Sequence, residues 1–155
     1  MNYIIENISR FINKDDLVLD VGCGNKTYSI FGKTTTVDAW EKVNPDYLID
    51  LEADRLPFNE NSFDYILMLD FIEHLDKAKG EIVLNDCKKI VKTKIFILTP
   101  LVFNDNSINV NNISCWAYGN DYDYHKSLWT LNDFISWESI VTTPEFFFGY
   151  WDKHK

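Results

Sequence analysis

Short apolar runs separated by polar stretches recur along the first hundred residues, and five of them have the length and composition of buried strands. Five such runs in series predict a parallel sheet, and therefore an α/β fold. The chain opens with apolar residues at helical spacing, which predicts a helix over about residues 1–14 that covers the sheet. Its apolar face carries Ile4, Ile5, Ile8, Phe11 and Ile12, and the strand-like runs are 17–21, 34–38, 47–50, 63–69 and 95–99.

The connections between these runs are unusually short. Only the fourth connection shows a clear helical period, carried by Ile82, Val83, Cys87, Ile90 and Val91. A helical crossover between parallel strands needs about 10 to 12 residues in addition to the strand. Asp38 follows Asp20 by 18 positions and precedes Asp50 by 12. We therefore expect a short helix in the first crossover and little more than a loop over residues 39–45 in the second.

The last third of the chain changes character. Residues 103–124 are rich in asparagine and aspartate and lack a sustained period, which is typical of a functional lid or of a disordered segment, and we expect a lid here. A helix over 131–137 behind a Thr130 cap and two strands at 140–143 and 146–151 are expected beyond it. Half of the 24 aromatic residues follow position 114, enough to line a lid or to form a homodimer contact.

Length and composition narrow the class of protein. A chain of 155 residues predicts one domain over 1–155, and no apolar run is long enough to cross a membrane. The start lacks the basic end and the cleavage site of a signal peptide, and the cysteines (Cys23, Cys87 and Cys115) are odd in number and without paired spacing. Both features predict a cytoplasmic protein. A net charge of −9 disfavours nucleic acid as a partner.

A glycine turn is the first candidate for chemistry. Residues 17–24 read LVLDVGCG, so an apolar strand leads directly into Gly22 and Gly24 with Asp20 before them, and Asp38 closes the next strand-like run. Glycines allow a close approach of the backbone to a ligand, and a carboxylate one strand away can accept both ribose hydroxyls of an adenosine cofactor. Two simpler interpretations stay open: the glycines serve the turn alone, and Asp38 is a solvent-facing turn residue.

The order of motifs beyond this turn resembles one family. With LPFNENSFDYILMLDFIEHL and IFILTP, residues 17–100 resemble the class I S-adenosylmethionine-dependent methyltransferases. A weaker resemblance to the same family is found in HKSLWTLNDF. The resemblance implies a Rossmann-like fold whose seven-stranded sheet is mostly parallel, with an antiparallel C-terminal strand. It also implies S-adenosylmethionine as the cofactor, bound by Asp20, Gly22, Cys23, Gly24, Asp38, Ala39, Asp50, Leu51 and Leu69. Asp50 can equally cap a turn. Lys26 stands where the family has a third glycine, which either narrows the pocket or reroutes the loop.

A second constellation follows the fourth strand. If this segment is helical, Asp70, Glu73 and His74 occupy positions i, i+3 and i+4 on one face. Two carboxylates and an imidazole in this arrangement would form a binding site for magnesium or manganese. A similar Glu-x-x-Glu-His pattern binds metal in methyltransferases of ubiquinone biosynthesis and in those that act on small-RNA 3′ ends, and the latter resemblance adds His125 as a ligand. Without metal, Glu73 buttresses its helix, His74 pairs locally, and His125 is a general-base candidate; His74 is the second catalytic candidate.

The function expected from these features is methyl transfer to an oxygen or nitrogen of a small-molecule or sugar acceptor. Two alternatives remain. The first is metal-dependent 2′-O-methylation of an RNA 3′ end, which is supported by Asp70, Glu73, His74 and His125 and disfavoured by the negative net charge. A non-catalytic cofactor-binding domain gains from the short crossovers and from Lys26.

Overall fold

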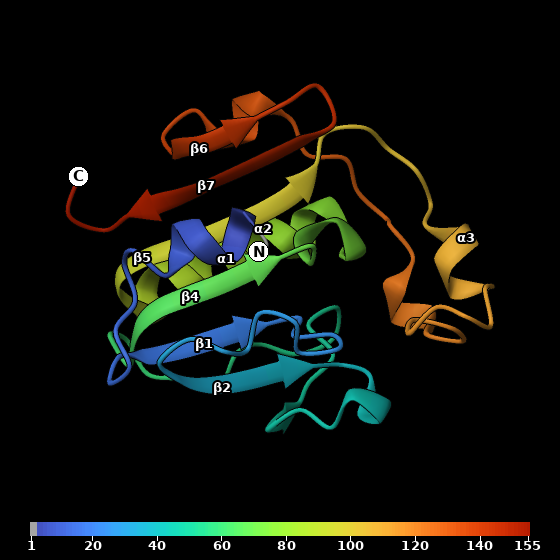
Figure 1. Ribbon diagram of the computed structural model, residues 1–155, viewed down its shortest axis with the longest axis horizontal. Coiled ribbons are helices and arrows are strands. Elements are labelled where there is room, and N and C mark those ends of the chain that lie inside the picture. The colour runs from blue at the N-terminus through green and yellow to red at the C-terminus, as the bar shows by residue number, and fades with distance from the viewer. Residues whose placement is uncertain (1–2) are drawn as a thin grey trace.

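The protein forms one seven-stranded sheet, seen in a computed structural model that describes residues 3–155 (Figure 1). The strand order is β3-β2-β1-β4-β5-β7-β6. Five strands run parallel, from β3 to β5, whereas β7 lies antiparallel to both β5 and β6. This confirms the predicted α/β architecture with an antiparallel C-terminal end. The strands are β1 (Leu17–Val21), β2 (Lys33–Asp38), β3 (Tyr47–Leu48), β4 (Phe63–Leu69), β5 (Val91–Pro100), β6 (Glu138–Thr142) and β7 (Phe146–Asp152).

Alternate residues of the central strands enter two separate apolar cores. Val18, Leu67 and Phe96 pack with Ile8 and Ile12 of the N-terminal segment on one face. Leu19, Met68 and Ile97 are among the side chains of the other face, where α2 (Lys77–Ile90) contributes its buried residues. The two helices α1 (Tyr3–Ile8) and α2 therefore lie on opposite faces of the sheet (Figure 1). Burial of successive strand residues on both faces explains the continuous apolar runs in the sequence.

The N-terminal helix is shorter than predicted. Helix α1 spans Tyr3–Ile8, and the first two residues of the predicted helix lie outside the described part of the chain. The Ser9 hydroxyl donates to the carbonyl oxygen of Glu6 at 2.9 Å, a side-chain bond that competes with helix continuation. Turns carry the chain onward, and Ile12 is still buried against the sheet. The apolar pattern was thus correct about the buried face and wrong about the helix length.

The crossovers are even more reduced than expected. Residues 22–32, between β1 and β2, form turns without a helix, so the prediction of a short helix there was wrong. The second crossover contains only the 3₁₀ turn η1 (Glu41–Val43), in agreement with the predicted loop. Five of the nine positive-φ positions among residues 3–155 fall in these two connections: Gly22, Gly24, Lys26 and Gly32 in the first, and Asn44 in the second. A chain that reverses within so few residues turns through such conformations instead of through a helix.

The C-terminal third contains short elements only. The segment 103–124 holds α3 (Ser107–Val110) and the 3₁₀ turn η3 (Asp121–Asp123), and Figure 1 places α3 beyond the carboxyl ends of the parallel strands. The predicted helix over 131–137 is a 3₁₀ turn, η4 (Leu131–Phe134), in which Thr130 and Asp133 cap one another. None of the helices formed by residues 3–155 has the length and apolar character that a bilayer-spanning helix requires.

Candidate active site

A cavity of about 610 Å³ opens at the carboxyl ends of β1, β2 and β4. Its wall combines the turn after β1, the residues after β2 and β3, the 3₁₀ turn η2 (Ile72–His74) after β4, and the segment 103–124. Ligands of open α/β sheets bind at this edge, where the strand order reverses between neighbouring strands. The volume lies in the range of pockets that enclose a ligand of cofactor size.

Gly22 and Gly24 have two structural reasons to be glycine. Their φ angles are +72° and +50°, in the left-handed region that side chains disfavour. A Cβ atom on Gly22 would lie 2.1 Å from Cδ2 of Phe71, so Gly22 also makes room for that ring. Both glycines line the cavity together with Cys23, whose thiol pKa is raised to about 12, chiefly by burial. The turn therefore presents backbone and a neutral thiol to the cavity.

Asp38 joins the glycine turn to the second strand. One carboxylate oxygen accepts a hydrogen bond from the backbone N–H of Gly24 and the other accepts from the N–H of Trp40, both at 2.9 Å. A carboxylate can accept about four hydrogen bonds, so each oxygen retains capacity for a ligand hydroxyl. Asp38 and Ala39 line the cavity. Asp38 is thus placed by the fold for a ribose contact and also organises the turn that would surround it.

Asp20 occupies a different place from the one predicted. Its carboxylate is buried behind the turn, accepts a hydrogen bond from the Ser29 hydroxyl at 2.5 Å, and is absent from the cavity wall among the described residues. Burial raises its pKa to about 6, and the bond from Ser29 opposes this shift. In the structure Asp20 supports the turn from behind, and no part of the cavity reaches it.

Lys26 reroutes the loop and leaves the cavity free. It has a φ of +63°, so a lysine adopts the left-handed conformation that the family's glycine would favour. Its ammonium group donates to the carbonyl oxygen of Asn44 at 2.6 Å, away from the cavity lining. The resulting tie between the two shortened crossovers gives a structural reason for this departure from the family pattern.

The remaining predicted cofactor residues lie in the wall. Asp50, Leu51 and Leu69 all line the cavity. Asp50 also accepts from the N–H of Glu52 at 2.9 Å, so it caps the turn that follows β3 as well as facing the cavity. The two interpretations of Asp50 left open by the sequence are therefore compatible.

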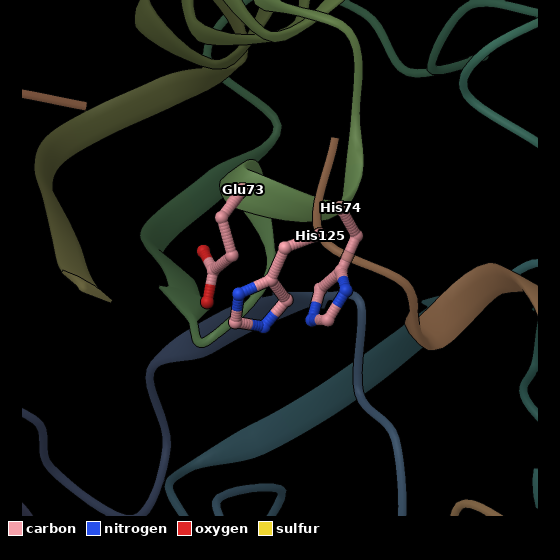
Figure 2. Close-up of side chains that lie close together, drawn as sticks. All are labelled: Glu73, His74 and His125. Carbon is pink, nitrogen blue, oxygen red and sulfur yellow. The ribbon is translucent and has the colours of Figure 1, made fainter. Parts of the chain in front are cut away.

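Glu73, His74 and His125 form a compact cluster at the same edge (Figure 2). One ligand-type atom from each lies within 4.8 Å of the others. Figure 2 shows Glu73 and His74 extending from η2 and His125 approaching from the chain beyond the segment 103–124. Two residues adjacent in sequence are thus joined by a histidine about fifty positions away.

The carboxylate of Asp70 is not part of this cluster, which corrects the predicted ligand set. The 3₁₀ turn η2 begins only at Ile72, and Asp70 precedes it with a φ of +53°. Asp70 therefore does not share a helix face with Glu73 and His74. Its side chain lines the cavity, and the surrounding walls withdraw enough water to raise its pKa to about 6.

Glu73 is a buried carboxyl group that stays protonated at neutral pH. Its side chain is 1% exposed and accepts a hydrogen bond from the Thr99 hydroxyl at 3.0 Å. Burial raises its pKa to about 8, with the negative charge of Asp70 adding to the shift. Its backbone carbonyl accepts from the N–H groups of Lys126 and Ser127, so Glu73 also fixes the chain next to His125.

The two histidines are neutral for the same reason. Burial lowers the pKa of His74 to about 4, and its ring nitrogens lie 3.3 Å from the carbonyl oxygen of Tyr124 and 3.1 Å from that of Asp70. Burial also lowers the pKa of His125, against the hydrogen bond that its ring makes with the backbone of Asn104. The rings meet edge to face with centroids 4.8 Å apart. A neutral imidazole has one N–H, so the His74 ring can donate to only one of these two carbonyl oxygens at a time.

The stability of the protein should fall as pH rises through the range in which Glu73 titrates. Its native pKa of about 8 lies above the ordinary value of 4.5, so the native state holds this proton more tightly than the unfolded chain does. The associated stability is complete below about pH 4.5 and is lost as pH approaches 8. Urea unfolding of wild type and Glu73→Gln should show a steeper loss between pH 5 and 8 in wild type. Equal slopes for the two proteins would contradict the assignment.

Several cavity residues were not identified from the sequence individually. Asp123 lies in the wall with its carboxylate 3.9 Å from Nε2 of His74, and burial raises its pKa to about 6. Asn106 donates to this carboxylate at 2.7 Å. Trp116 and Tyr122 come from the same segment. The only sequence signal was the lid prediction for 103–124, because these residues lack a period that would distinguish cavity-facing from exposed positions.

The chain belongs to the methyltransferase-domain family, whose pattern it matches over residues 19–98. An uncharacterized protein of Methanocaldococcus jannaschii is 30% identical over 145 residues, covering 84% of this chain. The chain spans 60% of the length of that relative.

Two solved structures with a similar fold are described as methyltransferases. A putative methyltransferase of Bacillus halodurans superposes with a TM-score of 0.61 and 14% identity, covering 90% of this chain and 70% of that one. An S-adenosylmethionine-dependent methyltransferase of Archaeoglobus fulgidus gives 0.57 and 19% identity, covering 83% and 61%. At these identities the likeness concerns the fold.

Proposed function

We propose that the protein transfers a methyl group from S-adenosylmethionine to an oxygen or nitrogen of a small-molecule or sugar acceptor. The observation that carries the proposal is the position of Asp38, which lies one strand from the glycine turn and bonds to Gly24 at the mouth of a cofactor-sized cavity. The family membership supports the reaction class.

The cavity wall fits the chemistry of the cofactor. Asp38 would accept the ribose hydroxyls, Ala39 and Leu51 would lie beside the adenine, and the turn from Gly22 to Gly24 would receive the amino-acid portion. When bound, S-adenosylmethionine supplies a methyl group on a sulfonium, which is activated for in-line displacement. The protein then has to orient the acceptor, exclude water and take up its proton.

His125 is the residue we propose as general base. It lines the cavity, and its lowered pKa keeps the imidazole neutral and able to accept a proton at neutral pH. His74 would act by positioning the His125 ring, since both of its own nitrogens face carbonyl oxygens. The backbone carbonyl oxygen of Glu73, which accepts from the N–H groups of residues 126 and 127, would hold this part of the chain in place next to the base.

The acidic surroundings favour a small acceptor. Asp70 and Asp123 line the cavity near the histidines, and Lys126, the nearby cation in the wall, is paired with Glu52 at 3.1 Å. A phosphate backbone would meet negative charge here as well as the net charge of −9. These features weigh against an RNA 3′ end as the acceptor.

A metal-dependent version of the reaction is the second candidate, because Glu73, His74 and His125 approach one another within 4.8 Å. Two imidazoles and one carboxylate suit manganese better than magnesium, which prefers oxygen ligands throughout. The ring nitrogens of His74 already face carbonyl oxygens, and Glu73 is protonated and bonded to Thr99. Occupancy by an ion would therefore require loss of a proton and rearrangement of His74.

One turnover assay separates these possibilities. Wild-type protein, His125→Ala and a blank without protein are each incubated with methyl-labelled S-adenosylmethionine and a fractionated small-molecule extract. Every sample is tested with added chelator and with added manganese. We expect wild type to label a small molecule equally in both conditions and His125→Ala to lose most of the activity. Loss in chelator with recovery in manganese would favour the metal. Binding without labelling in any fraction would contradict methyl transfer and support a non-catalytic domain.

A further inference from the structure

Trp116 brings the segment 103–124 against the cofactor turn. A Cβ atom on Gly24 would lie 2.9 Å from Cη2 of Trp116, so this indole edge lies directly over the glycine. The ring centroid of Trp116 is also 6.3 Å from that of Trp40, which follows Asp38 by two residues. An aromatic side chain from the distant segment thus reaches both parts of the chain that are expected to surround the cofactor.

The segment that carries Trp116 is folded upon itself. The N–H of Gly119 donates to the carbonyl oxygen of Val110 at 2.9 Å, and the Asn106 amide donates to the backbone carbonyl of Asp123 at 2.8 Å. Val110 and Ala117 are buried within it. These bonds tie the beginning of the segment to its end, so residues 103–124 form a compact cap.

Trp116 and Tyr122 are the two aromatic residues of the cap that line the cavity, and of these Trp116 is the one next to Gly24. It lines the cavity although its side chain remains 46% exposed. A large aromatic residue that stays half exposed inside a cavity wall has apolar area available for a ligand. Tyr118, two positions later, is 48% exposed and is outside the cavity wall. The two residues have similar exposure and differ in where they face.

We propose that Trp116 is a cofactor-positioning residue, which closes over bound S-adenosylmethionine next to Gly24 and slows its release. This inference rests on the proposed function, since it requires the cofactor to occupy the cavity next to Gly24. The cap must then open for each exchange of the cofactor. The role assigned to Trp116 is to hold the cofactor, so we expect its replacement to leave the stability of the unliganded domain unchanged.

The experiment compares wild type, Trp116→Ala, Trp116→Phe and the matched control Tyr118→Ala. S-adenosylhomocysteine is titrated calorimetrically into each, and its dissociation rate is followed by displacement in a stopped-flow instrument. Aromatic stacking contributes enough that we expect Trp116→Ala to weaken binding on the order of tenfold or more, mostly through faster dissociation. Trp116→Phe should restore most of the affinity, and Tyr118→Ala should match wild type.

The unfolding midpoint without ligand, measured in parallel, should be alike for Trp116→Ala and Tyr118→Ala. Equal affinity and equal dissociation rate for these two variants, with wild type binding normally, would overturn the role of Trp116 and leave the proposed function intact. Absence of binding to wild type would instead overturn the proposed function, and this inference with it.

Discussion

Replacing Asp38 with alanine is expected to weaken the binding of S-adenosylhomocysteine by roughly tenfold to a hundredfold. The carboxylate is the charged acceptor that the fold places one strand from the glycine turn, and charge-assisted hydrogen bonds of this kind contribute roughly 1.5 to 3 kcal/mol. The loss has two sources, because the change removes the ribose contact and also releases the N–H groups of Gly24 and Trp40. Isothermal titration calorimetry on wild type and Asp38→Ala measures the difference.

Asp46→Ala is a useful control for the structural part of this effect. Asp46 accepts hydrogen bonds from the backbone N–H and the hydroxyl of Thr36, which lies on β2 as Asp38 does. Asp46 itself is not part of the cavity wall. It therefore anchors the second crossover as Asp38 does, without facing a ligand. If both variants lost affinity equally, the effect would belong to the crossover, and the ribose assignment for Asp38 would be wrong.

Replacing Trp129 with alanine should lower the free energy of unfolding by about 3 to 5 kcal/mol, the usual cost of truncating a buried tryptophan. Its side chain is 1% exposed, stacks on Phe134 and donates from Nε1 to the Ser127 hydroxyl at 3.0 Å. The ammonium group of Lys77 lies 3.8 Å from its ring centroid. Gly80 of α2 leaves space for it, since a Cβ there would lie 2.6 Å from the ring.

The contrasting variant is Ile135→Ala. Ile135 is 86% exposed and follows the same 3₁₀ turn, so its truncation should change the free energy of unfolding by less than about 0.5 kcal/mol. Urea unfolding monitored by circular dichroism gives both values. A loss below about 1 kcal/mol for Trp129→Ala would show that the HKSLWTLNDF segment is not part of the core.

The sheet could be predicted from the sequence because its central strands are buried on both faces. Residues 65–69 of β4 and 95–98 of β5 read as continuous apolar runs for this reason, and the parallel order of the two strands follows from the connection between them. Helix lengths could not be predicted in the same way. Residues 9–12 keep the apolar spacing of a helix, yet they bury Ile12 through turns, because burial constrains where a side chain lies and leaves the backbone path open.

The cofactor-binding part of the candidate site could be predicted because its residues follow two neighbouring strands of the sheet. Gly22, Gly24 and Asp38 meet because adjacent parallel strands end at the same edge, which the order of the sequence already implies. Asp70 was misplaced because its positive φ breaks the helical spacing assumed for Glu73 and His74. Trp116 and Asp123 could not be assigned, since their positions depend on how the cap folds on itself, through bonds such as that from Asn106 to Asp123.

The central claim is that this reduced fold still binds the methyl donor, and a calorimetric titration of S-adenosylhomocysteine into the wild-type protein tests it most directly. S-adenosylhomocysteine is the product that remains when the donor has lost its methyl group, and it needs no acceptor and no metal for this measurement. We expect saturable binding with one site per chain, together with an unfolding midpoint that rises with ligand concentration, as linkage requires of any ligand selective for the native state. No heat of binding at millimolar ligand, with no rise in the unfolding midpoint, would contradict the account.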